Sequence, residues 1–386
     1  MTVAGPDLLR FSPEEMRRRT DALDTALAEA GARHCVVYGA NRTGSGVQWL
    51  TGWPVTREAV VVHTPGLPDV LLVNFYNHVP QASALAIDAD VRWAGASTAD
   101  SVVTELEHRG AASGGVAVVG AVPFGVHGRL TDAFGPVAEL GPSYIRLRMR
   151  KSGEELARLR EAARLTDASC AALRDGTRAG STDHELGALV EASYRSVGGA
   201  NHIHYFSLTS MAEPQAAVPA QWPSGRVVAR GDVLACELSA SVAVDYPGQL
   251  LRSFTVAAEP TPLVRELHEI ADEALSRIEQ VLAPGVLPEQ IVSAAEVIED
   301  AGFTTIDDLV HGLGGGYLPP VFGSRSRTLS PLPATPFEEG MTVVVQPNVT
   351  TPDRTLGVQT GEMFEITSTG CRSLHDFPRG LGRITG

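Results

Sequence analysis

Two histidines separated by a single residue are the first feature of this sequence with the means to do chemistry. His202 and His204 lie in the segment Asn-His-Ile-His-Tyr-Phe, whose alternation predicts a strand with both imidazoles on one face. Such a pair could bind a metal ion or transfer protons. Because no third ligand lies close to them in the sequence, histidines that only form hydrogen bonds in a strand are the simpler interpretation. His311 stands alone in a glycine-rich segment, where a histidine is more often structural than catalytic.

The four cysteines indicate neither a zinc site nor a redox pair. Cys35, Cys170, Cys236 and Cys371 are far apart and form no Cys-x-x-Cys motif. Cysteine packs well as a small apolar side chain and is often buried. We therefore expect each of the four to be a buried packing residue.

The charge balance limits the partners of the protein. Its 386 residues include 31 Lys and Arg against 45 Asp and Glu, a net charge of −14, which is the wrong sign for binding nucleic acid or an anionic membrane. No apolar run approaches the roughly 20 residues that span a bilayer, and the first thirty residues lack the pattern of a signal peptide. We expect a soluble, cytoplasmic protein without nucleic-acid or membrane partners.

The length and the pattern of elements predict two domains. The first part begins with an amphipathic helix over residues 12–31, and short β-branched strands follow within an α/β layer. A Gly-Pro pair at 141–142 and a basic run after it predict a linker, so we place the domains at 1–143 and 144–386. In the second part, the start and stop signals predict helices near 153–174, 182–197, 263–282 and 288–301, and alternating apolar residues predict antiparallel strands over 227–256. Two helix pairs, each followed by strands, hint at an internal duplication.

Several motifs follow one another in the second part, at 144–180, 231–234, 251–254, 311–314, 339–347 and 357–370. Their order carries a resemblance to a known family. The second part resembles the catalytic domain of the pita-bread superfamily, which includes methionine aminopeptidase, prolidase, Xaa-Pro aminopeptidase and creatinase. In the first part, Trp-Leu-Thr-Gly at 49–52 is similar to the Tyr-Leu-Thr-Gly of the prolidase and creatinase branch. The resemblance implies an α/β (α+β) chain, with an N-terminal creatinase-like domain and a C-terminal pita-bread domain whose antiparallel sheet is flanked by helices.

The resemblance also locates the metal positions of the family. Its metallopeptidases hold two divalent ions with two Asp, one His and two Glu, and the ions activate a shared water. At those positions this chain has Glu237, Gln249 (or Gly248, because of a one-residue insertion), His311, Gln346 and Gly361, with Glu362 beside the last. Two further histidines of the family correspond to Ala220 and Leu318.

This set has lost most of the charge that two dications require. The family offers four carboxylates, whereas this chain offers Glu237 and at best Glu362, and neutral amides bind such ions weakly. We therefore expect no dinuclear centre, no metal and no cofactor. A single ion on Glu237, His311 and Glu362 is the alternative.

Creatinase is the precedent for a member of this fold that hydrolyses a small C–N substrate without metal, with His and Glu as acid and base. Creatine itself is not supported as a substrate here, because the matching positions are Ala220, Leu251 and Gln346. Our leading hypothesis is a metal-independent hydrolase of an amide- or amidine-type bond in a small polar molecule. Glu237 and His311 would transfer protons, with Glu362 as an alternative base. Candidate substrate-binding residues are Gln249, Gln346, His202, His204, Tyr246 and Tyr317.

Other functions fit the same residues. One is a single-metal hydrolase of the Xaa-Pro aminopeptidase kind. A second is an inactive relative that binds a small molecule in the cavity, and a third is a lyase or isomerase that reuses it. Two-domain members of the superfamily commonly form homodimers, so the resemblance predicts a homodimer.

Overall fold

The computed structural model describes residues 10–327 and 331–385 and contains two compact units. The N-terminal unit ends at Met149 and the C-terminal unit begins at Arg150. The stretch predicted as a linker is instead helix α6 (Gly141–Met149). Tyr144 in this helix is buried in the N-terminal core, and its hydroxyl donates to the Gly46 carbonyl at 2.8 Å. These contacts explain why the units divide after α6 rather than within it.

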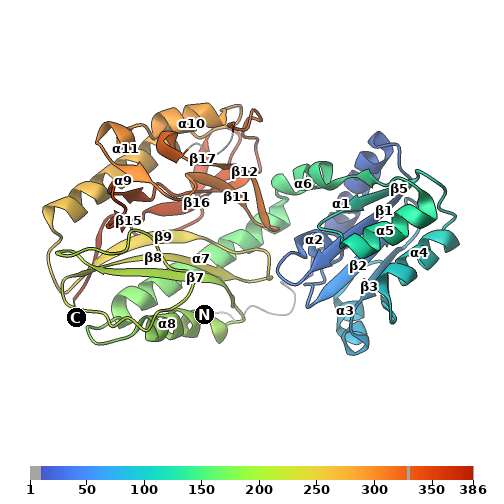
Figure 1. The fold of residues 1–386 in the computed structure, drawn as a ribbon, viewed down its shortest axis with the longest axis horizontal. Coiled ribbons are helices and arrows are strands. Elements are labelled where there is room, and N and C mark those ends of the chain that lie inside the picture. The colour runs from blue at the N-terminus through green and yellow to red at the C-terminus, as the bar shows by residue number, and fades with distance from the viewer. Residues whose placement is uncertain (1–9, 328–330, 386) are drawn as a thin grey trace. The chain divides into compact units, whose positions relative to one another are not determined.

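The N-terminal unit is a six-stranded sheet covered by helices on both faces (Figure 1). The strand order is β4-β3-β2-β1-β5-β6, with β1 antiparallel to β2 and parallel to β5. Neighbouring residues of β1 alternate between two cores: Val36 packs in the one that contains α4 and α5 residues, and Val37 in the one that contains α1, α2 and α6 residues. Helix α1 begins as predicted, because the Ser12 hydroxyl accepts from the Glu15 amide. The elements are α1 (Pro13–Glu29), β1 (His34–Ala40), α2 (Ser45–Thr51), β2 (Glu58–His63), β3 (Asp69–Val73), α3 (Val79–Leu85), β4 (Ala89–Trp93), α4 (Thr98–His108), β5 (Val116–Val119), α5 (Phe124–Phe134) and β6 (Ala138–Glu139).

The C-terminal unit is built on a large, mostly antiparallel sheet with strand order β12-β11-β13-β16-β9-β8-β7. Strand β17 pairs with β16, and β18 pairs in parallel with β9. Helices α7 and α8 pack against β8 and β7, whereas α9 packs against a second, small sheet of β10, β14 and β15 (Figure 1). The strands are β7 (Ala200–Ser210), β8 (Asp232–Ser241), β9 (Leu250–Val256), β10 (Thr304–Thr305), β11 (Val310–Leu313), β12 (Tyr317–Phe322), β13 (Thr342–Val345), β14 (Val349–Thr350), β15 (Gly357–Val358), β16 (Gly361–Ile366), β17 (Cys371–Ser373) and β18 (Gly382–Ile384).

The helices of this unit follow the sequence signals closely. Helix α7 begins with a capping box, in which Ser152 and Glu155 each bond to the backbone of the other. The fourth predicted helix, over residues 288–301, is two short helices instead of one. The helices are α7 (Gly153–Gly176), α8 (Asp183–Arg195), α9 (Pro262–Val281), α10 (Pro288–Ala294) and α11 (Val297–Asp300).

Within the described residues, no helix combines the length and the apolar character needed to cross a membrane. Of the four cysteines, Cys35, Cys170 and Cys236 are buried as expected. Cys371 is only half-buried, and its thiol donates to the Glu279 carbonyl.

Candidate active site

Glu237 occupies the centre of the candidate site on strand β8. It lies opposite Tyr205 of β7 and Leu251 of β9 in the sheet register. The side-chain amide of Gln249 donates to Glu237 Oε1 at 2.7 Å and also contacts Gln346 Oε1 at 3.3 Å. One amide group therefore links the carboxyl of Glu237 to the side chain of Gln346. Within the residues that the structure describes, only Oε1 of Glu237 accepts a hydrogen bond, which leaves Oε2 for a ligand.

Gln249 rather than Gly248 is the residue that reaches this site. A side chain at position 248 would collide with helix α7, because its Cβ would lie 2.5 Å from the Cα of Ala163. The glycine thus allows β9 to approach the helix, and the next residue projects its amide to Glu237.

The surroundings of Glu237 favour its protonated form. Burial raises the pKa of its carboxyl to about 8, and the nearby carboxyl of Asp307 acts in the same direction. Glu237 is therefore mainly neutral at pH 7 and can donate a proton through Oε2.

His311 lies on strand β11, and its surroundings keep it neutral. Its side chain is only 3% exposed, and its ring stacks on Tyr317 with centroids 4.5 Å apart. Burial is the main cause that lowers the pKa of His311 to about 4. A neutral imidazole can accept a proton at pH 7, so Glu237 and His311 have complementary proton-transfer properties.

Glu237 and His311 line one cavity with a volume of about 260 Å³. Two of the predicted substrate-binding residues, Gln346 and Tyr317, also line it. Gln249 supports the wall through its hydrogen bond to Glu237. The remaining lining residues are Tyr205, Val218, Pro219, Gln221, Ile306 and Asp307.

Asp307, which was not among the residues predicted from the sequence, is the second carboxyl group of this cavity. It lies in the loop between β10 and β11, and both of its oxygens accept hydrogen bonds. The amide of Asp308 donates to Oδ1 at 2.8 Å, and Asn348 Nδ2 donates to Oδ2 at 3.1 Å. The available signal was the pair of aspartates a few residues before His311.

Glu362 lies outside this group and is held by two arginines. Arg252 Nη2 donates to its Oε1 at 2.5 Å, and Arg379 donates to both carboxylate oxygens at 3.0 and 2.8 Å. Burial acts to raise the pKa of Glu362, but Arg379 and Arg252 outweigh it and hold the pKa at about 2. The structure therefore contradicts the prediction that Glu362 is an alternative base, because a carboxylate fixed between two guanidinium groups is a poor proton acceptor.

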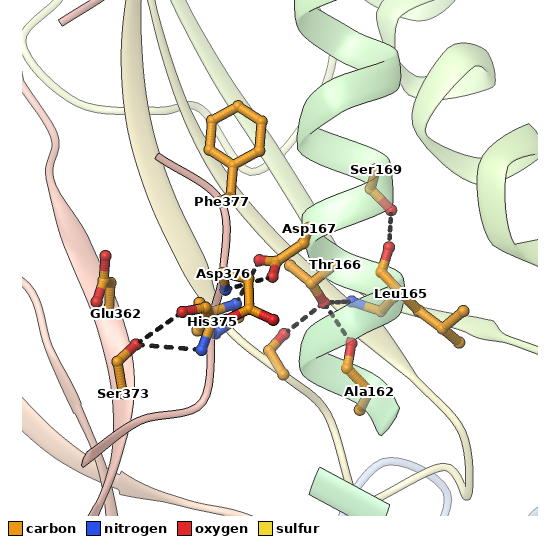
Figure 2. A network of polar contacts seen from close by, with 12 residues as sticks. Ala162, Leu165, Thr166, Asp167, Ser169, Glu362, Ser373, His375, Asp376 and Phe377 are labelled. Carbon is orange, nitrogen blue, oxygen red and sulfur yellow. Dashed lines mark hydrogen bonds and ion pairs between the residues drawn. The ribbon is translucent and has the colours of Figure 1, made fainter. Parts of the chain in front are cut away.

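A second polar network ties the C-terminal segment beside Glu362 to helix α7 (Figure 2). His375 Nδ1 lies 2.7 Å from Asp167 Oδ1, and the amide of Asp376 donates to Asp167 Oδ2 at 2.7 Å. The carbonyls of Phe377 and Pro378 in this segment accept from Arg252. The network thus fixes the segment that completes the binding of the Arg252 side chain, and its role is structural.

Tyr246 is a structural residue rather than part of the cavity wall. Its side chain is 1% exposed, and its hydroxyl donates to Glu155 Oε1 at 2.9 Å. Glu155 is the capping residue of α7, so Tyr246 connects the loop before β9 to the start of that helix. The prediction that Tyr246 binds substrate is wrong for this structure.

The two strand histidines do not share a face as predicted. The pairing of β7 with β8 is irregular between Asn201 and Ile203, which makes His202 the extra residue of a β-bulge. His204 packs against α8, where its Nε2 would lie 3.1 Å from a Cβ at Gly187. His202 instead interacts with His311, and its charge is one of the causes that lower the pKa of the His311 imidazole. The bulge breaks the alternation on which the prediction depended.

Comparisons with known proteins decide the family. A model of metallopeptidase family M24 matches residues 157–368, which is more than half of the chain. The chain belongs to metallopeptidase family M24.

Solved structures extend this M24 assignment to the fold of the whole chain. The X-Pro aminopeptidase of Thermotoga maritima is 22% identical, with a TM-score of 0.79, over 95% of this chain and 99% of its own. Dipeptidase PepE of Mycobacterium ulcerans is 21% identical, with a TM-score of 0.80, over 97% and 99%. A prolidase of Thermococcus sibiricus is 19% identical, with a TM-score of 0.81, over 97% and 100%. The likeness confirms the pita-bread fold. No curated protein matches the sequence.

The side chains of this M24 member do not fit the metal centre that the family implies. At the metal positions, the Gln249 amide presents hydrogens to Glu237, whereas a cation requires lone pairs there. A side chain at Gly361 would meet the Val345 carbonyl at 2.8 Å, so this position cannot supply a carboxylate without rearrangement. The single-ion alternative also loses a ligand, because Glu362 binds Arg252 and Arg379. Among the described residues, no three His, Cys, Asp or Glu side chains converge on a possible metal position.

Proposed function

We propose that this M24 member is a metal-independent hydrolase that cleaves a C–N bond, of amide or amidine type, in a small polar substrate. One observation carries the proposal: a carboxyl with a pKa of about 8 and an imidazole with a pKa of about 4 line the same cavity. Pairs of groups whose environments drive their pKa values apart are typical of acid–base catalysis.

The reaction assigns one proton transfer to each group. Neutral His311 accepts a proton from water as the water oxygen bonds to the substrate carbon. The C–N bond then breaks, and Glu237 Oε2 donates its proton to the leaving nitrogen. The proton on His311 returns to Glu237 through solvent, which restores both groups. The products are a carbonyl compound that contains the water oxygen and a free amine.

The protonation states at neutral pH favour this assignment over its reverse. With these pKa values, the population with Glu237 protonated and His311 neutral is about 10⁴-fold larger, at any pH, than the population with Glu237 ionised and His311 protonated. A mechanism that uses ionised Glu237 as base and His311 as acid would have to act through that rare state.

The two glutamines have positioning roles in this proposal. Gln249 donates to Glu237 Oε1, which leaves the acidic proton on Oε2 and fixes the direction of the carboxyl. Gln346 accepts from Gln249 and its side chain also forms a hydrogen bond with His311, so it holds the imidazole in place beside the carboxyl of Glu237.

The test is a screen of small amides and amidines in H₂¹⁸O, followed by kinetics of Glu237→Gln and His311→Asn on the substrate found. We expect one ¹⁸O atom in the carbonyl product, and a loss of kcat of at least about 100-fold in each variant. Glu266→Gln, an exposed carboxylate on α9, is the matched control that retains full activity.

Three outcomes would contradict the proposal. Unchanged turnover in a variant that combines Glu237→Gln with His311→Asn would show that neither residue takes part in the mechanism. Turnover without ¹⁸O incorporation would indicate a lyase or isomerase. Activity that disappears on chelation and returns with Zn²⁺ or Mn²⁺ would indicate a metallohydrolase.

A further inference from the structure

We infer that the Glu237–His311 cavity selects substrates that carry a positive charge, such as an ammonium or amidinium group, and that Asp307 recognises this charge. The inference deepens the proposed function and rests on it, because it takes this cavity as the substrate site.

The charge of the cavity wall is the first observation. The ten lining residues include two carboxyl groups, Glu237 and Asp307, and no lysine or arginine. An anionic substrate would therefore meet only groups that repel it or are neutral. Arg327 lies near Asp307, but its guanidinium forms an ion pair with Asp308 at 2.8 Å.

The bonding of Asp307 is the second observation. Both of its oxygens are fixed by N–H donors, from Asp308 and Asn348, and these donors are uncharged. Within the described part of the chain, Asp307 forms no ion pair with Lys, Arg or His. A partly buried carboxylate without a cation is costly, and a substrate cation would remove that cost.

The aromatic rings of the wall favour the same kind of ligand. Tyr205 and Tyr317 both line the cavity, and aromatic rings attract cations. The hydroxyl of Tyr317 donates to Asp308 at 2.9 Å, which holds the ring at this position.

The size of the cavity limits the ligand to a small molecule. Its volume of about 260 Å³ is just below the range of roughly 300–1,000 Å³ that is typical for drug-sized ligands. Such a cavity accommodates a compact cation more readily than a peptide with several side chains.

Three compounds of nearly the same shape test the inference at pH 7. Benzamidinium, benzamide and benzoate carry charges of +1, 0 and −1, and their binding can be measured by ligand-observed NMR titration of the whole protein. We expect benzamidinium to bind at least 10-fold more tightly than benzamide, and benzoate to bind most weakly. Asp307→Asn should reduce the preference for benzamidinium over benzamide by about 10-fold or more, whereas the control Glu266→Gln should retain it.

A second measurement keeps the test decisive if Asp307→Asn does not fold. In the unmodified protein, the affinity for benzamidinium should fall as the ionic strength rises from 20 to 500 mM. The affinity for benzamide should not change. Equal binding of the three compounds, or a preference that survives Asp307→Asn, would overturn the inference. Displacement of benzamidinium by one equivalent of Zn²⁺ or Mn²⁺ would also overturn it, because the charge would then serve a metal ion.

The two proposals fail separately. Binding is measured without turnover, so benzamidinium can bind as expected even if Glu237 and His311 prove not to be catalytic. Conversely, Glu237 and His311 variants that lose turnover of a neutral amide, in a protein that does not prefer benzamidinium, would leave the proposed function standing and refute the inference.

Discussion

Replacing Glu237 by glutamine should stabilise the folded protein at neutral and alkaline pH, while it abolishes turnover. The pKa of this buried carboxyl rises from 4.5 to about 8 in the fold. A carboxyl group whose pKa is raised by folding does not reduce the free energy of unfolding at a pH below its unfolded pKa. The reduction grows as the pH rises towards the folded pKa. Glutamine has a similar shape, accepts the same hydrogen bond from Gln249 and never ionises.

The magnitude follows from the two pKa values. Each unit of difference corresponds to about 1.4 kcal/mol, so the reduction is about 3 kcal/mol at pH 7 and about 4 kcal/mol at pH 8. It is close to zero at pH 4. Glu237→Gln should gain these amounts of unfolding free energy over the unmodified protein.

The assay is urea unfolding followed by far-UV circular dichroism at pH 4.5, 7 and 8. The difference between variant and unmodified protein isolates Glu237, because the other titrating groups are common to both. Glu266→Gln, which replaces an exposed carboxylate on α9, is the control substitution measured under the same conditions. A gain that is the same at pH 4.5 and pH 8, or a loss at pH 8, would refute the assignment of a raised pKa to Glu237.

Two further outcomes follow from the other perturbed groups. Glu362→Gln should destabilise the protein by about 3 kcal/mol at pH 7, because a carboxyl whose pKa falls from 4.5 to about 2 on folding stabilises the folded state above pH 4.5. In urea unfolding, the difference between the variant and the unmodified protein should shrink as the pH falls towards 2. A difference that does not change with pH would contradict the ion-pair explanation. The pH profile of kcat/KM should be bell-shaped, with limbs near pH 4 for His311 and near pH 8 for Glu237; activity that keeps rising above pH 8 would assign the base role to Glu237.

The sequence predicted the fold because its signals are local and repeated. The helix starts at Ser12 and Ser152 depend on side chains within three residues of the cap, and the structure contains both caps. The motif order predicted the pita-bread fold, which the family match and the solved structures confirm. The domain boundary was less accurate, because the burial of Tyr144 is a tertiary contact that leaves no local pattern.

The candidate site was only partly predictable. The positions of Glu237, His311 and Gln346 came from the motifs, and the structure places all three at one cavity. Asp307 lies outside these motifs, and its place near Glu237 depends on the path of a loop between two sheets. The bulge at His202 was equally invisible, since a single extra residue in a strand reverses the faces that alternation predicts.

The sequence by itself determined which groups are available at the metal positions: one glutamate, one histidine and neutral amides. Only the tertiary structure decided what each group does. Glu362 is next to a family position in the chain, yet Arg252 from another strand and Arg379 from the C-terminal segment hold it as an ion pair. Glu237 has no such partner and becomes a weak acid instead. Identical carboxyl groups acquire opposite properties because a pKa depends on burial and on charges brought close by folding, which the order of residues along the chain does not specify.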